Sequence, residues 1–116
     1  FRRKYMMSLR RRWLIMKNDN VLSMLGLAKR GGNIVSGEFS VENAIRDQSA
    51  YLVVIAKDAS DKTKKKFSDK CSFYNVPIAF YADKETLGKS IGCEIRTSAA
   101  VTDEGLAKSL ISKLDL

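Results

Sequence analysis

Six consecutive apolar residues, Tyr51 to Ala56, limit the fold of this chain more than any other feature of its sequence. The run is too short for a typical helix, and its β-branched members Val53, Val54 and Ile55 favour a strand that is buried on both faces. Before and after the run, apolar residues recur instead at the three- and four-residue spacing of helices. Because helices that connect strands pack onto the sheet, such a strand lies between two helical layers. We therefore predict an α/β domain, a three-layer α-β-α sandwich with a small mixed sheet.

Capping residues and glycines indicate where the helices begin and end. Ser, Thr, Asp and Asn cap the first turn, and glycine commonly follows the last one. In chain order the expected elements are a helix from residues 18–20 to Gly31-Gly32, an extended piece at 33–35, a helix capped by Ser36, the strand at 51–56, a helix capped by Ser60, an extended segment at 78–81, a short helix between Asp83 and Gly92, a last strand with its loop at 94–101, and a helix capped by Thr102 or Asp103. The order of the strands does not follow from these patterns.

The net charge of +8 is distributed unevenly along the 116 residues. Residues 1–16 hold six basic side chains and no acidic one, whereas residues 17–116 hold 15 basic and 13 acidic ones. The length suits one hydrophobic core. We predict a basic N-terminal extension at 1–16, either a native arm or an addition upstream of a start at Met16, followed by a single domain at 17–116. Since the extension carries most of the charge, the net charge is weak evidence for what the domain binds.

Residue types that dominate catalytic and metal sites are scarce. The chain has no histidine, and its two cysteines, Cys71 and Cys93, lack CxxC spacing. Histidine is the commonest general base, and histidine and cysteine are the usual zinc ligands. The apolar runs are shorter than the roughly 18 residues that cross a bilayer. We expect a cytoplasmic protein with reduced cysteines, no enzyme activity, no metal and no cofactor.

The segment Ser36-Gly37-Glu38-Phe39-Ser40 is the strongest candidate for a binding site. It puts unpaired backbone amides, a glycine, a carboxylate and a hydroxyl at the start of one expected helix. Such a helix start receives phosphates or the polar edges of bases, although an ordinary helix cap explains the same residues. The lysines from Lys62 to Lys66 likewise fit either phosphate contacts or a solvated helix face.

Several short motifs spread over residues 21–116 occur together in one known family. They are Leu25-Gly26-Leu27-Ala28-Lys29-Arg30, Val35-Ser36-Gly37-Glu38, Ala44-Ile45-Arg46, the stretch from Leu52 to Asp58 with Ala59-Ser60, Lys64-Lys65-Lys66, Asn75-Val76-Pro77, Leu87-Gly88-Lys89 and Val101-Thr102-Asp103-Glu104-Gly105. In this pattern the chain resembles the ribosomal protein L-seven-Ae and L-thirty-e superfamily, and in particular its bacterial YlxQ-like branch.

The resemblance implies an α-β-α sandwich that binds structured RNA, often a kink-turn, without catalysing a reaction. In that family the start of the second helix reads a tandem of sheared G·A pairs, and a loop before the last helix makes apolar contacts to an extruded base. Carried over to this chain, the RNA-binding helix start is Gly37, Glu38, Phe39 and Ser40 with Asn43 one turn later, and the loop at 96–101 supplies Arg96, Thr97, Ser98, Ala99 and Ala100. Beside the residues carried over, we expect the basic residues Lys29, Arg30 and Arg46 to surround the helix start. The expected partner is structured RNA such as ribosomal RNA, bound by a monomer without membrane contact.

The first turn of that second helix departs from the family pattern. The strongest kink-turn binders have Gly-x-Asn-Glu there and a lysine one turn later, whereas this chain has Gly37-Glu38-Phe39-Ser40 and Asn43. Two groups that read base edges and one phosphate-binding cation are therefore changed. Phe39 can stack on an exposed base or be partly buried. Two hypotheses stay open: an RNA-binding protein, with or without kink-turn specificity, and a protein-interaction adaptor that keeps the fold.

Overall fold

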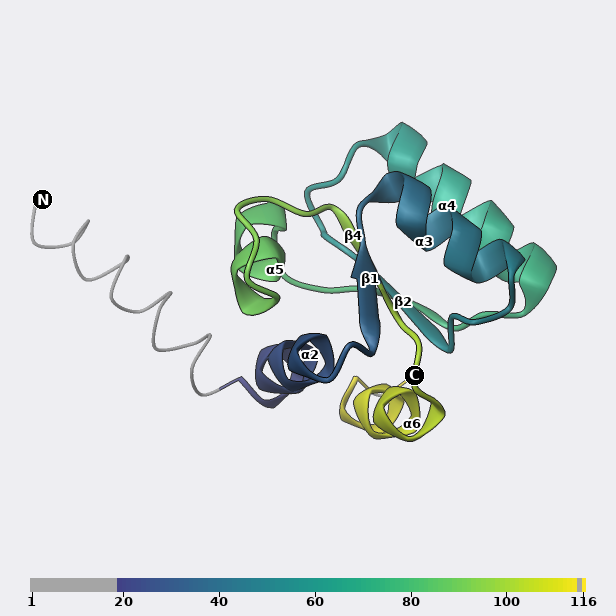
Figure 1. Cartoon of the computed structure of the whole chain (residues 1–116). Helices are drawn as coiled ribbons and strands as arrows, with labels where there is room; N and C mark the ends of the chain where they lie inside the picture. Colours follow the sequence, from purple (N-terminus) through teal and green to yellow (C-terminus); the bar gives the residue numbers. More distant parts are fainter. Residues whose placement is uncertain (1–18, 115) are drawn as a thin grey trace, which may run out of the picture.

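The computed structural model of the chain describes residues 19–114 and 116 (Figure 1). The basic extension predicted at 1–16 lies outside these residues. The described elements follow in the order α2 (Asn20–Arg30), β1 (Ile34–Ser36), α3 (Glu38–Arg46), β2 (Leu52–Ile55), α4 (Asp61–Tyr74), β3 (Ile78–Phe80), α5 (Lys84–Ser90), β4 (Ser98–Val101) and α6 (Glu104–Lys113). Within the described ranges, no helix combines the length and the apolar character needed to cross a membrane.

The four strands form one mixed sheet in the order β1-β4-β2-β3. β4 lies antiparallel between β1 and β2, and β3 pairs with β2 in parallel. At the middle of the sheet Val54 lies opposite Ala99 of β4 and Ala79 of β3. Every residue of β2 and β4 is buried. The middle of the apolar run, Leu52–Ile55, therefore forms a buried central strand as its composition predicts, whereas Tyr51 and Ala56 lie outside the strand and Tyr51 is exposed.

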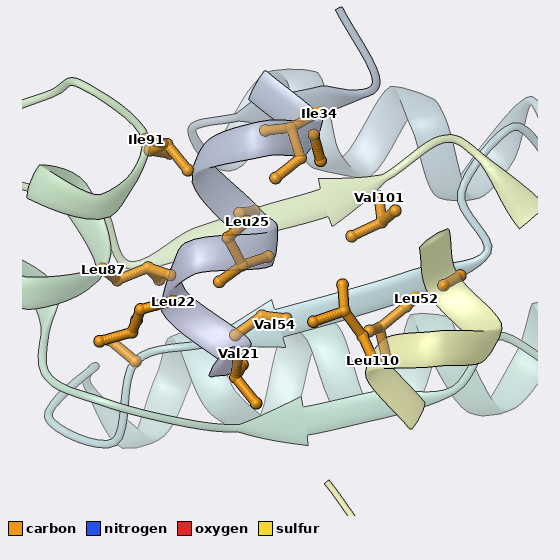
Figure 2. Close-up of a cluster of buried hydrophobic side chains, with 14 residues drawn as sticks. Val21, Leu22, Leu25, Ile34, Leu52, Val54, Leu87, Ile91, Val101 and Leu110 are labelled. Atoms are coloured by element: carbon orange, nitrogen blue, oxygen red, sulfur yellow. The ribbon is translucent and has the colours of Figure 1, made fainter. Parts of the chain in front are cut away.

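Helices cover both faces of this sheet (Figure 1). Successive side chains of a strand point to opposite faces, so Leu52 and Val54 pack with α2, α5 and α6, whereas Val53 and Ile55 pack with α3 and α4. Figure 2 shows the first of the two cores, in which Leu110 of α6 lies beside Leu52. The three-layer α-β-α sandwich with a small mixed sheet is confirmed.

Most of the described helices begin at the expected capping residues. The caps whose side chains accept a hydrogen bond from a first-turn amide are Asp19, Ser60, Asp83 and Asp103. Helix α3 differs, and the prediction that Ser36 caps it is wrong. Ser36 is the last residue of β1, and Gly37 takes the N-cap position without a side-chain cap.

The last strand is also shorter than the predicted segment at 94–101. It contains Ser98, Ala99, Ala100 and Val101, all of which are 0% exposed. The prediction that Ser98, Ala99 and Ala100 belong to a surface loop that contacts RNA is wrong. These residues form the ladder between β1 and β2, and their small side chains lie between the two helical layers.

Candidate nucleic-acid interface

The start of α3 is an uncapped helix end at the edge of the sheet. Gly37 has φ 92° and ψ 149°, a conformation that glycine adopts without the steric cost of a Cβ atom. Its backbone N–H donates to the carbonyl oxygen of Ser98 at 3.2 Å, which ties the helix start to β4. The first turn of any helix leaves amides without intrahelical acceptors, and no side chain caps these ones. The helix start therefore presents N–H donors that suit an anion.

Three side chains extend from this first turn. Glu38, Phe39 and Ser40 are all exposed, and Phe39 is 77% exposed. Of the two alternatives for Phe39, the structure shows the exposed one. A solvent-facing aromatic ring beside amide donors is a combination that stacks on unpaired bases. We call residues 37–40 the α3 tip.

The loop between α5 and β4 passes next to the α3 tip. The backbone N–H of Arg96 donates to the carbonyl oxygen of Lys84 at 3.0 Å, which anchors the loop to the start of α5. The Arg96 side chain then reaches β1, where its Nε donates to Ser36 Oγ at 3.1 Å, while a terminal nitrogen donates to the Ile95 carbonyl at 2.9 Å. The loop is therefore joined to the residue that directly precedes the α3 tip, although sixty residues separate Arg96 from Ser36 in the sequence.

Close packing against α5 fixes the path of the same loop. A Cβ atom on Gly88 would lie 2.8 Å from the carbonyl oxygen of Glu94, so only glycine lets the loop cross the helix here. The next residue, Ile95, is 49% exposed beside Arg96. Ile95 lies one residue before the loop predicted at 96–101 and is absent from the predicted site. In the sequence, Ile95 stands out as an isolated apolar residue that fits neither a helical nor a strand periodicity.

Helix α4 brings positive charge to the α3 tip. Lys66 Nζ lies 2.8 Å from Glu38 Oε1 and also contacts Glu42 Oε1. A hydrogen bond and the charge of Lys66 lower the pKa of Glu38, and the charge of Lys62 lowers it further. Of the lysine run singled out in the sequence, Lys66 is thus placed against the tip, 28 residues away along the chain.

Other predicted site residues lie away from the tip. Arg46 ends α3, eight residues or about 12 Å along the helix axis from Glu38. Lys29 and Arg30 end α2 on the opposite side of the sheet, where they line a groove with Lys89. The structure does not bring these basic residues together with the tip.

The two remaining predicted residues are half-buried. Asn43 lies in the second turn of α3, and Thr97 is the last residue before β4. The carbonyl oxygen of Thr97 accepts a hydrogen bond from the Ala56 amide at 2.9 Å, which holds the end of the loop against β2. Asn43 follows the α3 tip in the sequence and Thr97 ends the loop. Both side chains are less exposed than Phe39.

The chemistry of this surface is that of binding. It combines helix amides, an exposed ring, a guanidinium group and the exposed Ile95. In the described part of the chain, no three His, Cys, Asp or Glu side chains form a group that could hold a metal. Cys71 is buried in the core between the sheet and helices α3 and α4, and burial raises the pKa of its thiol to about 11. A thiol with that pKa is protonated at neutral pH and is a poor nucleophile.

Comparisons with known proteins place this chain in one family. The model of the ribosomal protein L7Ae/L30e/S12e/Gadd45 family matches residues 19–111. The RNA-binding protein YlxQ of Bacillus subtilis (strain 168) is 49% identical over 92 residues, which are 79% of this chain and 92% of that protein. The RNA-binding protein YlxQ of Enterococcus faecium is 37% identical over 90 residues, 78% of this chain and 86% of that one.

A solved structure shares the architecture closely. It is described as a protein with unknown function from Bacillus halodurans C, has a TM-score of 0.81 and 35% sequence identity, and the match covers 84% of this chain and 98% of that one. The family model extends from α2 into α6, across all four strands of the sheet. The chain therefore belongs to the ribosomal protein L7Ae/L30e/S12e/Gadd45 family, in the bacterial branch that contains the YlxQ proteins.

Proposed function

We propose that this chain binds structured RNA, without catalysing a reaction, through the α3 tip and the loop between α5 and β4. The observation that carries the proposal is the hydrogen bond from Arg96 Nε to Ser36 Oγ at 3.1 Å. It holds a guanidinium group next to uncapped helix amides. Two kinds of hydrogen-bond donor that can bind a phosphate therefore lie on the same surface. The two YlxQ relatives, which are named RNA-binding proteins, support the same function.

Each part of the surface has a role in this proposal. The amides of the α3 tip and the Arg96 side chain receive backbone phosphates. The Phe39 ring stacks on a base that has left the helix of the RNA, and Ile95 packs against an apolar edge of the same or a neighbouring base. Because such contacts need unstacked bases, the ligand is a bent, bulged or looped RNA and not a continuous duplex.

The specific ligands that we propose are ribosomal RNA and kink-turn RNA. The family resemblance implies them, while Phe39 and Ser40 replace the Asn and Glu that read base edges in the strongest kink-turn binders. We propose that Phe39 substitutes stacking for those hydrogen bonds, so that a bent RNA is still preferred over its unbent counterpart. Lys29, Arg30 and Arg46 are proposed only as outer phosphate contacts, since they lie away from the tip.

Binding of a fluorescent kink-turn RNA tests this function. Affinity for the kink-turn is compared with affinity for a duplex of the same length without the bend, at 0.1 M salt. Phe39→Ala and Arg96→Ala should each weaken binding by about tenfold, the effect of losing one stacked base or one charged hydrogen bond. Phe73→Ala is the matched control, because Phe73 is 79% exposed in the last turn of α4. Equal effects of Phe39→Ala and Phe73→Ala would exclude the tip as the binding site.

A protein-interaction adaptor is the second candidate. The observation that favours it is the pair of carboxylates, Glu38 and Glu42, in the first two turns of α3. Carboxylates repel phosphates but suit a basic protein partner. Purification from its own cells decides between the two: the adaptor predicts a stoichiometric protein and no nucleic acid, whereas RNA binding predicts RNA that leaves the protein at high salt.

A further inference from the structure

The first two turns of α3 carry two negative charges and no positive one. From Glu38 to Ile45 the helix contains Glu38 and Glu42, and its first basic residue is Arg46 at the far end. An RNA phosphate that approaches the helix amides therefore meets two carboxylates. A cation at this place has to come from another element of the fold.

Helix α4 supplies that cation. Lys66 Nζ contacts one carboxylate oxygen of Glu38, at 2.8 Å, and one of Glu42. The Lys66 side chain keeps 36% of its surface exposed, whereas that of Glu42 keeps 16%. An ammonium group has three N–H donors, and the hydrogen bond to Glu38 uses one of them. The exposed part of the Lys66 side chain leaves room for a ligand beside the two carboxylates.

We propose that Lys66 is the phosphate-binding cation of the RNA interface, and that Glu42 competes with RNA for it. This inference rests on the proposed function and adds a residue from a helix that the sequence did not connect with the site. In the free protein the Lys66 ammonium group pairs with both carboxylates and offsets one of their two negative charges. In the complex its ammonium group shifts toward a phosphate and leaves the less exposed Glu42.

A salt titration of RNA affinity tests the role of Lys66, with Lys65→Ala as the matched control. Lys65 is the exposed neighbour on the same helix, and its loss changes the net charge by the same amount. Lys66→Ala should weaken binding about fivefold and lower the slope of log K against log salt by about 0.7 to 0.9, the share of one phosphate contact. Lys65→Ala should leave the slope unchanged, and Lys66→Arg should restore it.

Competition by Glu42 makes a second, opposite prediction. Glu42→Gln should tighten binding by roughly threefold, because RNA then meets a less engaged ammonium group. The gain should disappear in the Lys66→Ala background. If instead Glu42→Gln tightens binding equally with and without Lys66, general repulsion explains the effect and the competition is overturned.

Two further outcomes distinguish a failure of the Lys66 role from a failure of RNA binding itself. Equal affinities and equal salt slopes for Lys66→Ala and Lys65→Ala overturn the role of Lys66 and leave RNA binding intact. Failure of the unmodified protein to bind any structured RNA overturns both. Circular dichroism of each variant confirms that the affinities compare folded proteins.

Discussion

Arg96 and Ser36 are joined by a hydrogen bond of 3.1 Å from Nε to Oγ, and this contact holds the loop between α5 and β4 against the start of α3. Neither element makes a binding surface alone. The helix start offers amides and the exposed Phe39, while the loop offers a guanidinium group and the exposed Ile95. The proposed interface therefore depends on how the two elements pack, and substitutions that move one element relative to the other should weaken ligand binding without touching the ligand.

Gly37→Ala should strain the turn that starts α3. Nothing lies within 4 Å of the added Cβ atom, so the cost comes from a backbone conformation that is almost restricted to glycine and should be about 1–3 kcal/mol. Urea unfolding measures it, with Gly105→Ala in α6 as the control, because that glycine has no positive φ and its replacement should stabilise the helix by about 0.5–1 kcal/mol. A neutral Gly37→Ala would show that the backbone is not strained there.

Gly88→Ala should displace the loop that carries Arg96. The new Cβ atom would lie 2.8 Å from the Glu94 carbonyl oxygen, and backbone atoms have to move to relieve the clash. Such overpacking costs about 1–3 kcal/mol, and the displaced loop should bind RNA less tightly.

Gly26→Ala serves as the control for that variant. Its Cβ atom would meet the Ser90 carbonyl oxygen at 2.9 Å, a similar clash between α2 and α5. Both variants should lose stability, and binding by the folded protein should fall only for Gly88→Ala. Equal binding by the two variants would contradict the loop's part in the interface.

Ser98→Ala should stabilise the protein. The Ser98 hydroxyl is buried in β4 and, within the described residues, has no hydrogen-bond partner. Removal of such a group recovers its desolvation cost, on the order of 1 kcal/mol. Ser60→Ala gives the contrast, because the Ser60 hydroxyl accepts from the Thr63 amide at 3.2 Å and its loss should destabilise α4 by about 1 kcal/mol. Thermal unfolding of both variants tells whether the Ser98 hydroxyl is unsatisfied in solution.

The contribution of Tyr81 to the free energy of unfolding should be lost at alkaline pH. Burial, together with a hydrogen bond to Asp19 and the charge of that carboxylate, raises the pKa of Tyr81 from 10.0 to about 12. The neutral phenol is favoured in the folded state, so its contribution is complete below pH 10 and is lost as the pH rises toward 12. The stability advantage over Tyr81→Phe, measured by urea unfolding, should shrink across this range. A constant difference would contradict the shift.

Local signals predicted most of the fold, because caps and buried strands are encoded by neighbouring residues. Asp19 and Ser60 cap their helices in the structure, and the β-branched run forms β2. The sequence does not show that Ser98 to Ala100 form a buried strand, because serine and alanine are not among the residue types enriched in strands and their place in β4 depends on pairing with β1 and β2. The Lys66 contact with Glu38 spans 28 residues and depends on how two helices pack, which no local pattern encodes.

The most direct test of the interface is an NMR titration of the labelled protein with a kink-turn RNA, read at each backbone amide. We expect the largest shifts at residues 37–40 and 94–97, and no shift at Phe73 in the last turn of α4. Shifts concentrated elsewhere, with the amides of Gly37 and Arg96 unmoved, would contradict this expectation.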